Sequence, residues 1–138
     1  MNIRRPTYGV NFPFDDGDNG DFLKLTTTPE LEVKTNLIHL LLTKRGSRYY
    51  LPDFGTNLYQ YIFEPLDDIT MGKIEDEIID AVEKYIPNLT INKIIINKFY
   101  DQIEFVGDDK LQHTIKINLD YTVNSRTFQS SGTVTLLL

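Results

Sequence analysis

Few residue patterns in this sequence are suited to catalysis, and one glutamate stands out among them. Glu64 lies between apolar neighbours, with Phe63 on one side and Pro65 on the other. A glycoside hydrolase needs one carboxyl group that an apolar setting keeps protonated, and a second carboxylate across the scissile bond. Asp67 and Asp68 are near in sequence, but they precede an amphipathic stretch and are placed to cap a helix. We therefore expect no catalytic residue, and a peptidoglycan hydrolase that uses Glu64 is the alternative.

Other patterns that would indicate a cofactor or metal site do not occur. The chain has no cysteine, which removes thiolate nucleophiles and most zinc sites. The two histidines, His39 and His113, have no ligand partner at metal spacing, and neither Gly-rich phosphate loop is present. The acidic loop from Asp15 to Asp21 does not space its oxygens as an EF-hand does, and Thr27 stands where the bidentate glutamate belongs. We expect no cofactor, no metal and no small-molecule substrate.

Composition and charge restrict the possible partners. The formal net charge is −6 at pH 7, which argues against a protein that must neutralise phosphates with a basic face. No apolar run is long enough to span a membrane. We therefore expect neither nucleic acid nor a membrane as a partner. The 138 residues suit one domain, 1–138, with an extended arm (1–28), a helical part (29–86) and a β-sheet part (89–138).

The helical part begins with a clear N-terminal signal. Thr28 can cap a helix and Pro29 suits the first helical position. We expect this helix to run to about Arg45, with Gly46 as the left-handed residue just past it. Its second half is rich in leucine on more than one face, so that either its own domain or a partner must enclose it. Two further helices are expected over 56–63 and 68–86.

From Leu89 onward the apolar period changes to two, which indicates β-strands. The clearest strand is 115–123, where apolar residues at odd positions alternate with polar ones. Other strands are expected over 89–98, with an irregularity near Asn92-Lys93, and over 127–137; residues 101–106 continue or pair with the first, and 107–109 form a hairpin turn. The fold class is therefore α+β, with two to three N-terminal helices packed on a C-terminal antiparallel β-meander of three to four strands.

A series of short motifs occurs in a specific order and spacing. They are Gly9-Val10-Asn11-Phe12-Pro13-Phe14, Leu41-Leu42-Thr43, Gly46-Ser47-Arg48, Pro52-Asp53-Phe54-Gly55, Leu58 and Phe63-Glu64-Pro65. Together they resemble the baseplate wedge family of contractile phage tails, which includes the tail-sheath initiator and has relatives in the type VI secretion baseplate. The resemblance covers nearly the whole chain, although many members carry Glu where Ser47 stands.

The resemblance implies a structural protein of the virion. Members of the family sit in the tail baseplate, join the wedge proteins, and pair their β-rich end with a subunit of the first sheath ring. The expected partners are therefore the wedge proteins and the tail sheath protein, and the expected location is the tail baseplate, assembled in the cytoplasm of the host bacterium. The lysozyme-like label that the family often carries then looks like a misattribution. An equivalent part of a type VI secretion-like machine is a further alternative.

The stretch between the first two helices is expected to form a rigid corner. Arg48 is placed where its guanidinium could pair with a carboxylate, and Glu64 is the obvious candidate. The residues expected to shape the corner are Gly46, Arg48, Pro52, Phe54, Gly55, Glu64 and Pro65. Tyr49 and Tyr50 would then point outward, and tyrosine is a residue type that anchors interfaces. The corner is either a purely intramolecular joint or a joint that also contacts a partner.

The C-terminal run is unusually apolar for a strand. It carries no charged side chain after Arg126 and ends in Thr133, Val134, Thr135, Leu136 and Leu137, followed by one more leucine. Such a strand is poorly protected if it lies at the edge of a sheet. From the residues alone it is either central in its own sheet or paired at its edge with another chain. The family resemblance favours pairing with sheath.

Overall fold

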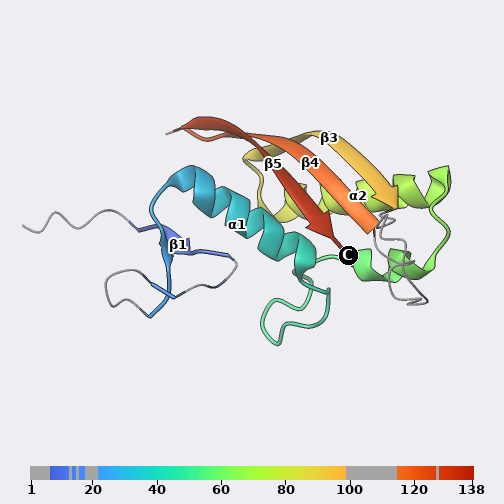
Figure 1. Cartoon of the computed structure of the whole chain (residues 1–138), viewed down its shortest axis with the longest axis horizontal. Helices are drawn as coiled ribbons and strands as arrows, with labels where there is room; N and C mark the ends of the chain where they lie inside the picture. Colours follow the sequence, from blue (N-terminus) through green and yellow to red (C-terminus); the bar gives the residue numbers. More distant parts are fainter. Residues whose placement is uncertain (1–6, 13, 15, 18–21, 99–114, 127) are drawn as a thin grey trace, which may run out of the picture.

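The computed structural model describes residues 7–12, 14, 16–17, 22–98, 115–126 and 128–138 (Figure 1). Their elements are β1 (Gly9–Val10), β2 (Leu25–Thr26), α1 (Pro29–Leu42), the 3-10 helix η2 (Leu58–Phe63), α2 (Asp68–Tyr85), β3 (Leu89–Lys98), β4 (Ile115–Asn124) and β5 (Gln129–Leu137). The helices precede a three-stranded antiparallel sheet of order β3-β4-β5. The α+β class and the meander predicted from the sequence are therefore confirmed.

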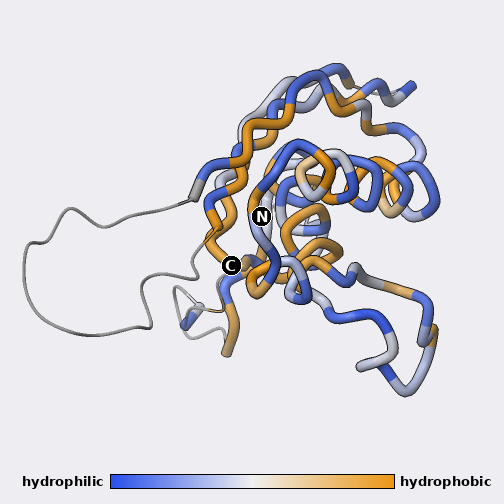
Figure 2. The backbone as a smooth tube through the Cα atoms, turned by 90° about the vertical axis from the view of Figure 1, so that its right-hand side faces the viewer, coloured by the Kyte–Doolittle hydropathy of each residue, from blue (hydrophilic) through white to orange (hydrophobic). Residues whose placement is uncertain are grey.

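One face of the sheet packs on the helices and the other is polar. Figure 2 shows the sheet as a curved layer lying over the helices. In β4 the residues at odd positions are buried and those at even positions are more accessible, as the period of two requires. The buried apolar residues of the core are Leu37, Leu40, Leu41, Leu58, Tyr61, Ile74, Ile78, Ala81, Val82, Leu89, Ile96, Ile115, Ile117, Leu119, Tyr121, Val123, Val134 and Leu136.

The sheet contains two local features that depend on particular residues. The β3–β4 register shifts between Ile91 and Lys93, so that the predicted irregularity is confirmed. In β5, Gly132 stands opposite Tyr121, and a Cβ added there would lie 2.6 Å from the tyrosine hydroxyl. Glycine at this position therefore makes room for a large buried ring on the neighbouring strand. The strand expected at 101–106 and the turn at 107–109 lie outside the described residues.

Helix α1 starts as predicted but ends earlier. The Thr28 side chain accepts a hydrogen bond from the Leu31 N–H at 3.3 Å, and Pro29 is the first residue of the helix. The helix ends at Leu42, three residues before Arg45, because Thr43 takes an extended conformation. The Thr43 N–H still makes the helical bond to the His39 carbonyl at 3.1 Å, and its hydroxyl donates to the same oxygen at 2.6 Å. Its leucine-rich half is enclosed by the protein's own core.

The second helix is also shorter than expected, whereas the third agrees closely. The predicted helix 56–63 is a 3-10 helix that begins at Leu58, because Thr56 bonds to the end of α1 instead. Helix α2 begins after Asp67, whose carboxylate accepts the Thr70 N–H at 2.8 Å. That hydrogen bond holds the pKa of Asp67 below its ordinary value of 3.8. Among the described residues, no helix is long and apolar enough to cross a membrane.

The described part of the N-terminal arm folds against the start of α1. Strands β1 and β2 pair antiparallel, with Gly9 opposite Thr26. Thr26 is fully buried and donates its hydroxyl to the Glu32 carboxylate at 2.8 Å. That carboxylate lies against Gly9, where an added Cβ would overlap it. The small residue at position 9 therefore allows the hairpin to approach the helix closely.

Candidate interaction sites: the corner loop and the edge strand

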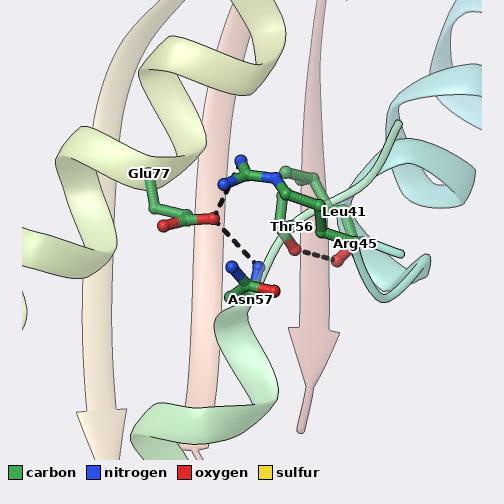
Figure 3. A network of polar contacts seen from close by, with 5 residues as sticks. All are labelled: Leu41, Arg45, Thr56, Asn57 and Glu77. Carbon is green, nitrogen blue, oxygen red and sulfur yellow. Dashed lines mark hydrogen bonds and ion pairs between the residues drawn. The ribbon is translucent and has the colours of Figure 1, made fainter. Parts of the chain in front are cut away.

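Residues 43–57, here called the corner loop, leave α1 and return beside its end. The chain is closed at the neck by two backbone hydrogen bonds, from the Arg45 N–H to the Thr56 carbonyl (3.0 Å) and from the Thr56 N–H to the Thr43 carbonyl (2.8 Å). The hydroxyl of Thr56, which is fully buried, donates to the Leu41 carbonyl at 2.8 Å (Figure 3). In the view of Figure 1 the loop projects from α1 on the side away from the sheet.

Two glycines of this loop take a left-handed conformation, which favours glycine. Gly55 has φ +113° and is packed so closely that an added Cβ would overlap the Thr43 carbonyl oxygen. Gly46 has φ +83°, with open space around it. The left-handed conformation expected at Gly46 is therefore present, but it lies within the loop and not directly after the helix. Its N–H donates to the Pro52 carbonyl at 2.7 Å, which closes the outer part of the loop.

An ion pair that the sequence analysis missed fixes the corner loop to α2. The guanidinium of Arg45 lies 3.2 Å from the Glu77 carboxylate, and the same oxygen accepts the Asn57 N–H at 2.9 Å (Figure 3). The Glu77 side chain is 15% exposed and that of Arg45 is 41% exposed. A sequence signal existed, since Glu77 falls three residues after Ile74 and four before Ala81, within the buried stripe of α2.

Arg48 has a different partner from the one expected. Its guanidinium carbon lies 4.6 Å from the centre of the Phe54 ring, a cation–π arrangement. Within the described part of the chain it forms no ion pair with Glu64. Glu64 is exposed, and its backbone N–H bonds to the Tyr61 carbonyl at 3.2 Å, where η2 ends before Pro65. The expected pairing of Arg48 with Glu64 is therefore wrong in this structure.

Phe54 connects the corner loop to both long helices. Its half-buried ring makes edge contacts with His39 of α1, with centroids 5.8 Å apart, and with Tyr85 of α2, at 5.0 Å. The residue packs against the hydrophobic core. The Arg48 guanidinium packs over this same ring, so that Phe54 also holds Arg48 in place. The loop is therefore anchored by an aromatic side chain as well as by its backbone bonds.

The tip of the corner loop presents apolar side chains to solvent. Tyr49 is fully exposed and Tyr50 is 79% exposed. Leu51 is half exposed and has φ +56°, a left-handed conformation that is uncommon for a residue other than glycine. The Leu51 carbonyl accepts the Phe54 N–H at 3.0 Å. This hydrogen bond and the left-handed Leu51 define the turn at the tip of the loop.

In the sheet formed by the described residues, strand β5 lies at an edge and not in the centre, because it pairs with β4 alone. In antiparallel strands, pairs that exchange both backbone hydrogen bonds alternate with pairs that exchange none. Ile115 and Leu138 exchange both, at 3.1 and 3.0 Å. Continuing in steps of two along the register, Val134 and Leu136 direct their backbone groups at β4, whereas Thr133, Thr135 and Leu137 direct theirs away from it.

The side chains at the end of β5 alternate in the same way, between the core and the outer face of the sheet. Val134 and Leu136 are buried in the core, whereas the side chains of Thr133, Thr135 and Leu137 are exposed on the outer face. The two threonine hydroxyls donate to side chains of β4, Thr133 to Asp120 at 2.8 Å and Thr135 to Asn118 at 2.9 Å. The core-facing side chains thus fix the position of the strand, while no other described strand pairs with its outer backbone groups.

Comparison with known proteins identifies the family. The family model "Baseplate wedge protein gp25" matches residues 28–127, a range that contains the helices, the corner loop, β3 and β4. The chain belongs to the baseplate wedge protein gp25 family. Baseplate wedge protein gp25 of Enterobacteria phage T4 is 34% identical over 65 residues, which are 47% of this chain and 48% of the phage protein. The match therefore spans about half the length of that relative.

Two solved structures share the fold of this gp25-family protein. A putative tail lysozyme from Geobacter sulfurreducens has a TM-score of 0.63 and 19% identity, with 82% of this chain and 92% of that one covered. A chain of the anti-feeding prophage baseplate has a TM-score of 0.58 and 17% identity, with 91% and 81% covered. The first name refers to a lysozyme and the second to a baseplate, so that the names alone suggest different activities.

Proposed function

We propose that this gp25-family protein is a structural component of a contractile tail baseplate. It joins the wedge proteins and offers the first ring of the tail sheath a strand with which to pair. Its location is the virion tail baseplate, after assembly in the cytoplasm of the host bacterium. The observation that carries the proposal is the outer edge of β5, which no other described strand covers and which has no proline and no charged side chain along its length. A contractile secretion machine of the type VI kind could use the same edge.

The geometry of β5 supports main-chain pairing in particular. An extended segment added to a sheet edge gains affinity from backbone hydrogen bonds and needs few matching side chains. Every second residue of β5 turns its N–H and carbonyl outward, including Thr133 and Thr135. The strand is nine residues long, from Gln129 to Leu137. A sheath segment could therefore form several hydrogen bonds without disturbing the bonds between β5 and β4.

One backbone donor can be removed to test this pairing. Proline at Thr135 removes an N–H that points away from β4, and proline is tolerated at edge positions of this kind. Deletion of residues 133–138 is less suitable, because it would remove Val134 and Leu136 from the core. Thr135→Ala is the matched control, since it loses the hydroxyl bond to Asn118 but keeps the N–H. Both variants should fold, which their thermal unfolding would verify.

The assay is co-expression with the sheath and wedge proteins encoded beside this gene, followed by capture of this protein. The wild type and Thr135→Ala should capture both sheath and wedge proteins. Thr135→Pro should capture wedge proteins but not sheath. Sheath capture by a folded Thr135→Pro variant at the wild-type level would contradict strand addition through β5.

We also propose that the protein has no catalytic activity. A general acid needs an environment that keeps its carboxyl group protonated, whereas the Glu64 side chain is exposed. Glu64 then has only a structural role, as the residue that caps the end of η2. Purified protein should not clear peptidoglycan. Clearing by the wild type that is lost in Glu64→Gln would instead support the hydrolase.

A further inference from the structure

A groove lies between α1, the corner loop and the end of α2. Its volume is about 210 Å³, larger than the ~150 Å³ cavity that can hold a benzene molecule. The lining is mainly apolar and aromatic, and consists of Val33, Asn36, His39, Leu40, Phe54, Tyr85 and Ile86. The groove can therefore accept one large apolar side chain from outside.

Two cations lie beside the aromatic wall of this groove. The Arg48 guanidinium is 4.6 Å from the Phe54 ring centre, and the Lys84 ammonium is 5.2 Å from that of Tyr85. The two rings are themselves in edge contact, at 5.0 Å. Among the described residues no carboxylate lines the groove, and Asp53 is the acidic residue next to Phe54 in the chain. A locally cationic site thus lies on a protein whose net charge is −6.

We infer that this groove binds a segment of a partner protein in which one phenylalanine or leucine is flanked by carboxylates. The apolar side chain fills the groove, and the carboxylates meet Arg48 and Lys84. Charge complementarity favours an acidic segment over a basic one, because like charges in contact are strongly unfavourable. It also disfavours the corner-loop tip of a second copy, whose tyrosines Tyr49 and Tyr50 directly follow Arg48. This contact is separate from strand addition at β5.

Three synthetic peptides of equal length test the inference on the full chain. The first is acidic with a central phenylalanine, the second is acidic with a central alanine, and the third is basic with a central phenylalanine. Binding is measured by fluorescence anisotropy and by amide chemical shifts. The first peptide should saturate and shift the amides of Asn36, His39 and Phe54. The alanine peptide should bind about tenfold more weakly or worse, because it loses burial of the ring, and the basic peptide should not bind.

Variants of the protein separate charge from shape. Lys84→Glu should weaken binding of the acidic phenylalanine peptide about tenfold, and Arg48→Glu should act in the same direction. Lys34→Glu is the control, because it makes the same charge change at an exposed residue of α1 outside the lining. Asn36→Trp, at an exposed residue, should block the groove at any salt concentration. If the acidic phenylalanine peptide does not saturate, if the basic one binds equally well, or if Lys84→Glu equals Lys34→Glu, the inference is wrong.

Discussion

Replacing Glu77 by alanine is expected to destabilise the protein more than replacing Arg45, although the two residues form one ion pair. The reason is that the Glu77 carboxylate oxygen has two partners, the Arg45 guanidinium at 3.2 Å and the Asn57 N–H at 2.9 Å. Glu77→Ala leaves the Asn57 N–H without its acceptor in a partly buried place. Arg45→Ala removes only the half-exposed member of the pair.

The magnitudes follow from burial. A buried donor that loses its partner costs about 1–3 kcal/mol, and an ion pair with one exposed member contributes about 0–1 kcal/mol. Glu77→Ala should therefore lower the free energy of unfolding by about 2–3 kcal/mol, and Arg45→Ala by about 1 kcal/mol or less. Glu77→Gln retains an oxygen acceptor for the Asn57 N–H, so that its loss should be close to that of Arg45→Ala.

The assay is equilibrium urea unfolding of the three single variants and of the double variant Arg45→Ala, Glu77→Ala. A shift of the midpoint with an unchanged slope reports stability alone. The double variant should be no less stable than Glu77→Ala, because the ion pair is already lost. Equal losses for Glu77→Ala and Glu77→Gln would refute the reasoning, since they would mean that the charge and not the Asn57 N–H is responsible. A loss below about 0.5 kcal/mol for Glu77→Ala, within the range of ordinary surface changes, would refute it as well.

Three further changes test the local packing. Gly55→Ala should cost about 2 kcal/mol or more in urea unfolding, because it adds strain at φ +113° and a clash with the Thr43 carbonyl; a cost near zero would contradict the close neck of the loop. Gly132→Ala should cost about 1–3 kcal/mol through overpacking, and Tyr121→Phe in that background should recover part of the loss by removing the hydroxyl. Asp67→Ala should be more destabilised at neutral pH than in acid, because the ionised carboxylate is the stronger acceptor for the Thr70 N–H. Because the folded-state pKa of Asp67 lies below 3.8, the extra stability from the ionised cap is complete above pH 3.8 and is lost as the pH falls through the folded-state pKa. A difference from the wild type that is equally large in acid would contradict an ionised cap.

The elements with strong local signals were predictable from the sequence. The caps at Thr28 and Asp67 set the starts of α1 and α2, because their side chains bond to the first free N–H groups of the same helix. The alternation in 115–123 set β4, because its two faces meet different surroundings. In each case the residues that decide the structure are neighbours in the chain.

The elements that depend on distant contacts were not predictable in the same way. The neck of the corner loop is set by Thr43 and Thr56, which are thirteen positions apart and joined by the hydrogen bond from the Thr56 N–H to the Thr43 carbonyl. The partner of Arg45 is Glu77, on another helix, and Arg48 lies on Phe54 rather than beside Glu64. Sequence spacing indicates which charges are available, but the path of the corner loop decides which of them meet.

The edge of β5 and the groove beside the corner loop should act independently. The corner loop projects from α1 on the side away from the sheet in Figure 1, and none of the groove residues belongs to the sheet. An adaptor needs such an arrangement, because two partners can then bind without competing for one surface. Thr135→Pro should leave the affinity for the acidic phenylalanine peptide unchanged, and Lys84→Glu should leave sheath capture unchanged, as expected for two sites that have no residue in common. If Thr135→Pro weakened peptide binding while the variant stayed folded, the two surfaces would be coupled, and strain at the sheet edge would have to reach the helices through the core residues Val134 and Leu136.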